Sequence, residues 1–423
     1  MADKVRVIVI GGGAAGIFAA IACAGKLGPA GEVTVYEATA HPLAKVRVSG
    51  GGRCNVTHAC FEPRELVKFY PRGGRELLGA FHRWQPRDTV TWFATRGVET
   101  KTEADGRMFP VTDDSATIAE CLLRAAQEAG VRLVTSLGVR KVEATGRAGA
   151  PSFWVTLTDG AEVRCERLLV ATGGNRSSAG FTIAQALGHT IEPLVPSLFT
   201  FHIDDARLIG LSGVSLEEAV VSIPGTKLRA SGPLLITHWG LSGPAILKLS
   251  AWGARELADR NYEFPLIVNF ASPHTRESLT HELMSVREKN PRKQVTTWSP
   301  LAMPQRLWER LVTSSGIAAT TPWTGVGNAA LATLATQLTA AELKVVGKSL
   351  FKDEFVTCGG VKLSEVDFRR MESRVCPGLF FAGEVLDIDG VTGGFNFQAA
   401  WTTGMIAGEA MGEWTGEVTS AKS

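Results

Sequence analysis

A strand–turn–helix–strand pattern at the start of the chain constrains its fold more than any other feature. Val5–Ile10 is an apolar run typical of a buried parallel strand, and a glycine motif at residues 11–16 follows directly. Residues 14–27 are small and apolar, as in a packed helix, and residues 33–36 form a second apolar run that ends at Glu37. This order predicts the βαβ unit of a dinucleotide-binding fold.

Each residue of the motif has a separate physical role. Gly11 permits a tight turn, Gly13 lets the backbone approach a pyrophosphate, and Gly16 lets the helix pack closely on the strand. The helix N-terminus presents N–H groups and a positive dipole to phosphates. Glu37 stands where ribose hydroxyls need an acceptor, but the motif alone does not distinguish FAD from NAD.

Composition limits the classes of partner. The chain has 423 residues, enough for two or three domains, and 44 basic against 42 acidic residues give a net charge of +2. This balance argues against a dedicated nucleic-acid binder, so we expect a small-molecule substrate and no nucleic-acid partner. The sequence leaves the oligomeric state open.

Cysteine usage and hydropathy predict a cytoplasmic protein. Seven scattered cysteines lack metal-ligand spacing, so we expect a reducing compartment and no metal. The apolar N-terminus is broken by glycines and continues into the helix that the fold requires, which argues against a signal peptide. No apolar run approaches the roughly 20 residues of a membrane span, and no membrane partner is expected.

A second glycine-rich segment, residues 44–58, follows the first βαβ unit. Gly50 to Gly52 and then Arg53 form a loop that can lie against a ligand, with Arg53 as a fixed cation; a plain flexible loop is the alternative. Cys54 and Cys60 could form a redox dithiol beside a flavin, but incidental thiols are the favoured interpretation.

The rest of the first part alternates helices and strands. Residues 62–100 are expected to be helical, and Asp114 or Ser115 caps a further amphipathic helix. Alternating residues around an Asp–Gly turn at 159–160 predict a hairpin, and residues 167–174 predict a buried strand running into a second glycine turn.

The pattern changes from about Ile191. Short alternating runs bounded by proline and glycine predict a small antiparallel barrel, and residues 275–340 then contain helical segments. His238, in the segment THWGLSGP, could be an acid–base group, but a structural histidine is favoured.

The C-terminal part returns to the first sheet. A buried strand ends at Gly383-Glu384, and the segment LDIDGVTGG leads into a long helix of small residues. Glu384 or Asp387 can bind ribityl hydroxyls, and N–H groups at Gly394 to Asn396 can face the N1/O2 edge of a flavin. This second ligand-facing helix favours FAD over NAD. The sequence lacks a second glycine motif with its own strand and acid, so we expect no dedicated NAD(P)H domain.

Six motifs together resemble a known family: GGGAAG, SGGGRCNVT, GRMFP, THWGLSGPAIL, TCGGV and AGEVLDIDGVTGGFNFQAA. They are similar to bacterial NAD(P)/FAD-dependent oxidoreductases with a helical insert domain, the aminoacetone oxidase or bile-acid-pathway reductase type. The resemblance implies a glutathione-reductase-type FAD fold. Arg47 and His58 depart from the family pattern, which changes the expected pocket near the flavin.

The motifs and the resemblance predict the cofactor contacts but no catalytic residue. Cys54, Arg53 and His238 are the first candidates for mutation. The predicted FAD-binding residues are Gly11, Gly13, Ala14, Ala15, Gly16, Glu37, Lys45, Ser49, Gly50, Arg53, Cys54, Asn55, Val139, Thr172, Gly173, Gly383, Glu384, Asp387, Gly394, Phe395 and Asn396.

The predicted fold is α/β, with a Rossmann-like FAD-binding domain in two sequence parts and an inserted antiparallel β-barrel that itself carries a helical insert. The expected order is FAD domain over 1–190, barrel over 191–274, helices over 275–340, barrel return over 341–350 and FAD domain over 351–423. We predict an FAD-dependent oxidoreductase that takes hydride from NAD(P)H and reduces an activated alkene or a ketone. An oxidase or dehydrogenase that uses oxygen or quinone, and a non-enzymatic flavin sensor or scaffold, are the alternatives. A flavin enzyme that modifies RNA is a third, which the near-neutral charge disfavours and salt-sensitive RNA binding would support.

Overall fold

The computed structural model describes residues 4–146, 150–175, 178–349 and 356–413. The described residues form two compact units: unit 1 from the ranges 1–194 and 356–423, and unit 2 from the range 195–355. The predicted boundary between residues 350 and 351 lies outside the described residues.

Unit 1 is built on a seven-stranded sheet with the order β19-β20-β21-β10-β1-β2-β6. The strands from β21 to β6 run parallel, and β20 and β19 are antiparallel additions at one edge. Val9 of the central strand lies opposite Leu169 on one side and Val35 on the other, and its side chain is fully buried. The strands are β1 (Val5–Ile10), β2 (Gly31–Tyr36), β6 (Arg132–Val134), β10 (Arg167–Val170), β19 (Val366–Asp367), β20 (Glu372–Ser373) and β21 (Leu379–Phe381).

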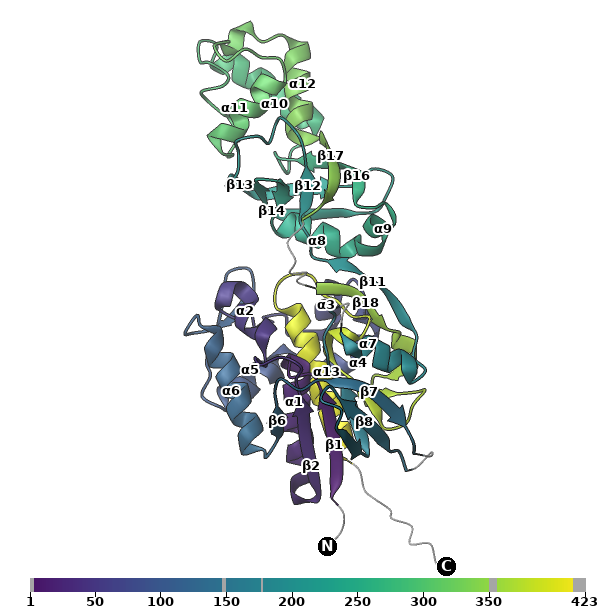
Figure 1. Cartoon of the computed structure of the whole chain (residues 1–423). Coiled ribbons are helices and arrows are strands. Elements are labelled where there is room, and N and C mark those ends of the chain that lie inside the picture. Colours follow the sequence, from purple (N-terminus) through teal and green to yellow (C-terminus); the bar gives the residue numbers. More distant parts are fainter. Residues whose placement is uncertain (1–3, 147–149, 176–177, 350–355, 414–423) are drawn as a thin grey trace, which may run out of the picture. The chain divides into compact units, whose positions relative to one another are not determined.

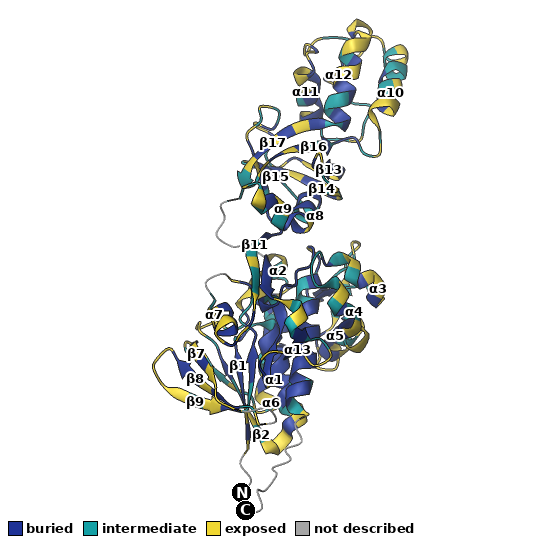
Figure 2. Cartoon of the chain, turned by 90° about the vertical axis from the view of Figure 1, so that its right-hand side faces the viewer, coloured by how far each residue is buried: buried dark blue, intermediate teal, exposed yellow. Residues whose placement is uncertain are grey.

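Two helices from opposite ends of the chain, α1 (Ala14–Leu27) and α13 (Phe395–Gly412), lie side by side in unit 1 (Figure 1). A Cβ on Gly404 would lie 2.7 Å from the carbonyl oxygen of Ala15, and one on Gly408 would lie 2.3 Å from that of Ala19. The small residues of α13 therefore let the two backbones meet, and both helices are mostly dark blue, or buried, in Figure 2.

The other helices of unit 1 follow the predicted segments. Residues 62–100 contain short helices, and Asp114 caps α6 by accepting from the N–H of Ala116. The remaining helices are α2 (Ala44–Gly52), α3 (Pro63–Leu66), α4 (Gly74–Arg83), α5 (Pro86–Ala94), α6 (Ser115–Glu128) and α7 (Ala179–Ala186).

Three smaller sheets complete unit 1. The predicted hairpin is confirmed as β8 and β9, and β7 pairs with β8. The three smaller sheets are β3-β5-β4 (Thr57–His58, Arg107–Pro110, Thr100–Thr102), β7-β8-β9 (Val139–Ala144, Phe153–Leu157, Glu162–Cys165) and β11-β18 (Ile191–Ser197, Val356–Val361).

The segment that begins at Ile191 differs from its prediction. It forms β11, which pairs with β18 of the C-terminal part instead of entering the barrel. Short apolar runs reveal a strand but not its partner, and these two strands are far apart in sequence.

Unit 2 contains a closed barrel in the order β12-β15-β14-β13-β16-β17. Its interior is apolar: Val221 lies opposite Val268, Leu266 lies opposite Leu343, and all four are buried. The strands are β12 (Phe201–Ile203), β13 (Ser215–Ser222), β14 (Arg229–Thr237), β15 (Gly240–Ser242), β16 (Glu263–Asn269) and β17 (Ala341–Lys348).

Helices cover and extend this barrel. The helices α8 (Pro244–Trp252) and α9 (Ala254–Asp259) follow β15. Between β16 and β17 lie α10 (Arg276–Lys289), α11 (Gln305–Ser314) and α12 (Asn328–Thr339). Trp308 and Trp323 are fully buried among them and continue the barrel core.

Within the described ranges, no helix combines the length and the apolar composition that crossing a membrane requires.

Candidate active site: a two-part cofactor cradle

The first glycine turn is packed tightly on one side and open on the other. Gly11 has φ +109°, and a Cβ there would lie 2.5 Å from the carbonyl oxygen of Ala171. A Cβ on Gly16 would lie 2.0 Å from the carbonyl oxygen of Gly11. A Cβ on Gly13, by contrast, would meet nothing within 4 Å. The turn thus leaves open space at the N-terminus of α1.

This open helix end has the properties of an anion site. The N-cap Gly13 provides no side-chain hydrogen bond, and the first turn of α1 contains no acidic residue. The first N–H groups of a helix have no intrahelical acceptor, and they carry the positive end of the dipole. The predicted residues Gly13, Ala14 and Ala15 therefore fit a pyrophosphate.

The carboxylate of Glu37 is held at the end of β2. Its Oε2 accepts the N–H of Gly12 at 2.7 Å, and its Oε1 accepts the N–H and the hydroxyl of Thr39, both at 2.8 Å. Each oxygen has further lone-pair capacity for a ribose hydroxyl. The N–H of Leu137 donates to the Glu37 carbonyl, which brings the predicted residue Val139, at the start of β7, toward this end of the sheet.

The second glycine turn adjoins the first. Thr172 and Gly173 follow β10, whose last residue Val170 lies opposite Ile10 of β1. The Cα of Thr172 is 3.1 Å from the position of a Cβ on Gly11, while a Cβ on Gly173 would meet nothing within 4 Å. The two predicted turns therefore meet at the carboxyl edge of the sheet, where ligands of doubly wound folds bind.

The C-terminal part completes this edge. Gly383 follows β21 with φ +76°, and its N–H donates to the hydroxyl of Thr403 at 2.9 Å. A Cβ on Gly383 would lie 2.8 Å from the Cβ of Ala15, so the turn touches the start of α1. Lys45 Nζ lies 2.6 Å from Oε2 of Glu384.

The SGGGRCN segment is bonded to the start of α13. With the amide of Asn55 oriented to satisfy both groups, its oxygen accepts the N–H of Gly394 at 2.9 Å and its nitrogen donates to the Thr57 carbonyl at 3.0 Å. Asn396 exchanges two hydrogen bonds with the backbone of Gly390. The first turn of α13 has no acidic residue and no side-chain cap, so its N–H groups suit an electron-rich ligand edge.

The glycine-rich segment is partly helical, which the sequence did not predict. The helix α2 covers residues 44–52, but Ser49, Gly50 and Gly51 depart from helical geometry, and Gly50 and Gly51 have positive φ. The expected loop is therefore confined to the end of this element.

Arg53 and Cys54 have partners within the protein that the sequence did not predict. Arg53 Nη1 donates to Glu103 at 2.7 Å, and its guanidinium lies 4.0 Å from the ring centre of Phe109. The guanidinium therefore already contacts an acidic and an aromatic side chain of the protein. Cys54 is fully buried, and burial raises the pKa of its thiol to about 12 against the opposing effect of a Ser49 hydrogen bond. Both cysteines of the Cys54–Cys60 pair are free thiols.

Asp387, the weaker of the two predicted acids, is directed inward. It is 8% exposed, and its Oδ1 accepts the N–H of Gly359 at 3.0 Å. Glu384, which bonds Lys45, is therefore the acid presented at the end of β21.

Several residues that support the cradle were missed. Arg72 pairs with the fully buried Asp389 in the loop before α13. The Tyr70 hydroxyl donates to the Phe395 carbonyl at 2.6 Å, and Trp401 Nε1 donates to the Val56 carbonyl at 2.9 Å. These partners are far apart in sequence, and no local pattern pairs them.

His58 forms part of an aromatic stack beside the cradle. Its ring lies 4.6 Å from that of Phe395, which stacks at 4.4 Å on Phe69. Burial lowers the pKa of His58, while the backbone carbonyl and charge of Asp105 act in the opposite direction. His58, which departs from the family pattern, therefore packs its ring on Phe395 near the start of α13.

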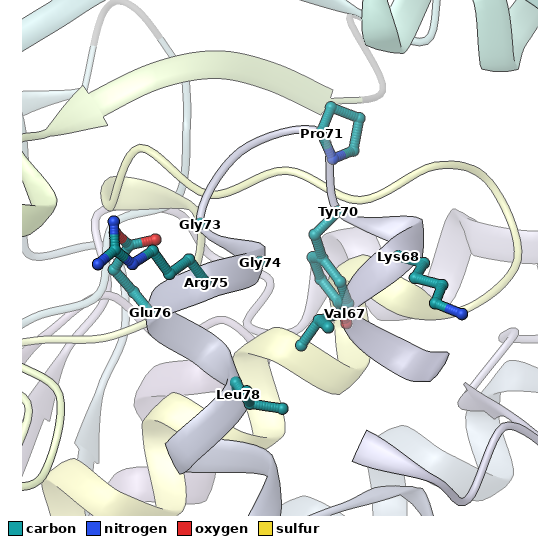
Figure 3. Close-up of a pocket in the computed structure, with 9 residues that line it drawn as sticks. All are labelled: Val67, Lys68, Tyr70, Pro71, Gly73, Gly74, Arg75, Glu76 and Leu78. Atoms are coloured by element: carbon teal, nitrogen blue, oxygen red, sulfur yellow. The ribbon is translucent and has the colours of Figure 1, made fainter. Parts of the chain in front are cut away.

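A separate pocket of about 370 Å³ is lined by residues of η2 (Val67–Phe69), of the loop that follows it and of the start of α4 (Figure 3). None of the predicted cofactor-binding residues lines it. In Figure 3 the side chains of Lys68 and Arg75 lie on different sides, and the ring of Tyr70 points toward α13.

The remaining candidate, His238, lies exposed in the turn between β14 and β15, and its ring centroid is 6.4 Å from that of Trp239. The sequence favours a capped, hydrogen-bonded structural role for His238, and the structure places the residue at the surface. The described ranges also contain no cluster of His, Cys, Asp and Glu that could hold a metal ion.

Comparisons with known proteins show the family of this chain. The family model described as HI0933-like protein Rossmann domain matches residues 5–410. The 3-dehydro-bile acid delta(4,6)-reductase of Clostridium scindens is 28% identical over 416 residues, which are 96% of this chain and 99% of the relative. The ribosomal RNA dihydrouridine synthase of Escherichia coli is 32% identical over 423 residues, with 95% and 96% coverage.

Solved structures with low identity share the fold. A 3-ketosteroid-delta4-(5alpha)-dehydrogenase from Rhodococcus jostii RHA1 aligns with a TM-score of 0.51 at 15% identity, covering 98% of both chains. A flavocytochrome c3 fumarate reductase aligns with a TM-score of 0.50 at 16% identity, covering 97% of this chain and 78% of its own. The chain therefore belongs to the HI0933-like Rossmann family, a family of FAD-dependent oxidoreductases.

Proposed function

We propose that this protein uses NAD(P)H to reduce a carbon–carbon double bond conjugated to a carbonyl group. One observation carries the proposal: two kinds of full-length relative act on unrelated molecules but share a reaction. One is named a delta(4,6)-reductase of a 3-dehydro bile acid and the other a dihydrouridine synthase. A 3-oxo-4,6-diene and the uracil ring both hold a C=C bond polarised by a carbonyl, so the acceptor carbon is electrophilic in each. Of the activated alkene and the ketone predicted from sequence, the alkene is favoured.

FAD, when bound in a glutathione-reductase-type arrangement, supplies hydride transfer between the nicotinamide and the acceptor. The N-terminus of α1 at Gly13 would hold the pyrophosphate, and Glu37 would accept the ribose hydroxyls. Lys45 and Glu384 would flank the linker to the ring. The N–H groups of Phe395 and Asn396, which follow the Gly394 N–H that Asn55 accepts, would stabilise negative charge on the reduced ring.

We propose uracil in ribosomal RNA as the first candidate for the hydride acceptor. The E. coli relative is 32% identical, and the Haemophilus influenzae protein of the same name is 29% identical over 94% of this chain. A 3-dehydro-4,6-diene steroid acid is the second candidate, supported by the 28% identical bile-acid relative. The absence of a nucleic-acid partner was inferred from net charge, and it stays a prediction that the RNA experiment decides.

The test begins with anaerobic mixing of the FAD-loaded protein with NADH or NADPH. Rapid bleaching of the flavin absorbance is expected with at least one nucleotide. The reduced protein is then mixed with rRNA transcribed in vitro, with a 3-oxo-4,6-diene bile acid, with oxygen or a quinone, or with buffer. Digestion of the RNA and mass spectrometry detect dihydrouridine, and chromatography detects the saturated steroid.

Reoxidation of the flavin by one alkene, with formation of its reduced product, supports the proposal and identifies the acceptor. Reoxidation by oxygen or a quinone alone favours the oxidase alternative and contradicts it. No bleaching with either nucleotide favours a sensor or scaffold.

A further inference from the structure

The helical part of unit 2 carries a compact group of cations with no carboxylate partner. Lys289 ends α10, and Arg292 and Lys293 follow in the next turn; all three are exposed. We call these three residues the basic turn. Ion pairs between described residues occur elsewhere in unit 2, such as Arg207–Asp205 and Arg260–Glu256, but none includes the basic turn.

The local charge is strongly one-sided. Glu288 is the only acid in the stretch 283–308, against Arg287, the basic turn and Arg306. Cations in the last turn of a helix also stabilise its dipole, which accounts for Arg287 and Lys289. Arg292 and Lys293 lie beyond the end of α10, so this explanation does not extend to them.

The backbone of the basic turn is fixed. The N–H of Lys293 donates to the Asn290 carbonyl at 3.1 Å, and its carbonyl accepts the N–H of the fully buried Trp323 at 2.9 Å. The N–H of Thr324 donates to the Pro291 carbonyl at 3.1 Å. The three cations are therefore presented from a rigid base, which lowers the entropic cost of binding an anion.

An aromatic side chain stands beside the cations. The Nζ of Lys293 lies 4.2 Å from the ring centre of the half-buried Trp298, and the neighbouring Gln294 and Thr297 are exposed. Cations for phosphates, an aromatic ring for a base and amide or hydroxyl groups for hydrogen bonds are the combination that single-stranded RNA requires.

We propose that the basic turn binds the phosphate backbone of the RNA substrate and that Trp298 stacks against an unpaired base. The inference rests on the proposed function, because a reductase of a free steroid acid needs no phosphate-binding surface. It also reconciles a near-neutral chain with an RNA substrate, since binding depends on local charge.

The experiment measures binding of fluorescent rRNA transcript by the FAD-loaded protein without NAD(P)H, between 50 and 300 mM salt. In the triple variant Lys289→Gln, Arg292→Gln and Lys293→Gln, we expect the Kd to rise about 10- to 100-fold at 100 mM salt. The slope of log K against log salt should fall by about 2 to 3. Trp298→Leu should raise the Kd about tenfold without changing that slope.

A matched control removes the same charge from unit 1. The triple variant Lys4→Gln, Lys68→Gln and Lys141→Gln loses cations that are paired with Glu32, Glu65 and Glu143, and it should bind RNA nearly as the native protein does. Flavin content and melting temperature, measured for all variants, show that each is folded.

Equal RNA affinity and salt slope in the native protein and the basic-turn variant overturn this inference, as does native protein that binds no RNA anywhere in this salt range. Binding and reduction are measured separately, so the two proposals fail separately. RNA binding that depends on the basic turn without formation of dihydrouridine supports the surface and contradicts the RNA reaction.

Discussion

Lys45 Nζ lies 2.6 Å from Oε2 of Glu384, although the two residues are 339 positions apart in the sequence. Lys45 belongs to α2 near the N-terminus, and Glu384 follows β21 near the C-terminus. The pair joins the two sequence parts of unit 1 at the carboxyl edge of the sheet, where both predicted cofactor segments end.

Glu384→Gln should weaken FAD binding by about 10-fold or more, because a charged acceptor for the cofactor's hydroxyls becomes neutral. Lys45→Met should have a smaller effect, because its side chain is 53% exposed while that of Glu384 is 16% exposed. Quenching of flavin fluorescence by the apoprotein measures both Kd values. Lys141→Met, which removes a surface ion pair with Glu143, is the control. Native affinity in Glu384→Gln would exclude this residue from the cofactor site.

Arg72→Met should destabilise the protein by about 3–5 kcal/mol, because it leaves the carboxylate of Asp389 buried without its charge partner. The double variant Arg72→Met and Asp389→Leu should recover most of that loss, since no buried charge remains. Urea unfolding of the apoprotein gives both free energies. A double variant as unstable as the single one would show that the pair itself, and not the orphaned charge, matters.

Cys54 should resist alkylation in the native protein. Burial raises the pKa of its thiol to about 12, so the reactive thiolate is scarce at pH 8. Cys60 is only partly buried and should react first. Iodoacetamide labelling with peptide mass spectrometry gives the two rates.

The same chemistry tests the redox dithiol. Cys60→Ser should retain flavin reduction by NAD(P)H and turnover with the identified acceptor. Loss of turnover in Cys60→Ser, with normal flavin content, would restore the dithiol hypothesis.

His189 should make stability depend on pH. Its side chain is fully buried, with Nε2 2.8 Å from the Ser373 hydroxyl and Nδ1 3.2 Å from Glu365. Burial lowers the pKa of His189 below its usual value, although the charge of Glu365 acts in the opposite direction. The unfolded chain therefore takes up a proton first, so this contribution to stability is present above about pH 6.5 and is lost as the pH falls below it.

The change is measured as the urea midpoint at pH 7.5 and pH 5.5. His189→Gln should show a smaller decrease between these pH values than the native protein. Equal decreases in the two proteins would assign the pH dependence to other groups, among them His58, whose pKa burial also lowers.

Local patterns predicted much of unit 1. The glycine motif, the cap at Asp114 and the hairpin around residues 159–160 depend on neighbouring residues, and each forms as expected. The closed antiparallel barrel was also predicted, because alternating runs reveal both faces of a strand.

The failures involve distant partners. The pairing of β11 with β18 and the ion pair of Arg72 with Asp389 join segments that no local pattern connects. The ion pair of Arg53 with Glu103 joins a glycine-rich segment to a residue 50 positions away, and no local pattern predicts it. The sequence shows which polar side chains a segment carries. It does not show which of them already have hydrogen-bond or ion-pair partners within the folded protein.

The most direct test of the cradle compares two glycines three residues apart. A Cβ on Gly13 meets nothing within 4 Å, whereas one on Gly16 would lie 2.0 Å from the Gly11 carbonyl oxygen. FAD is titrated into the apoprotein of each alanine variant, and thermal unfolding is followed in parallel. We predict that Gly13→Ala keeps nearly the native melting temperature as apoprotein but binds FAD at least about 100-fold more weakly, while Gly16→Ala is unstable. Native FAD affinity in a folded Gly13→Ala protein would contradict the account.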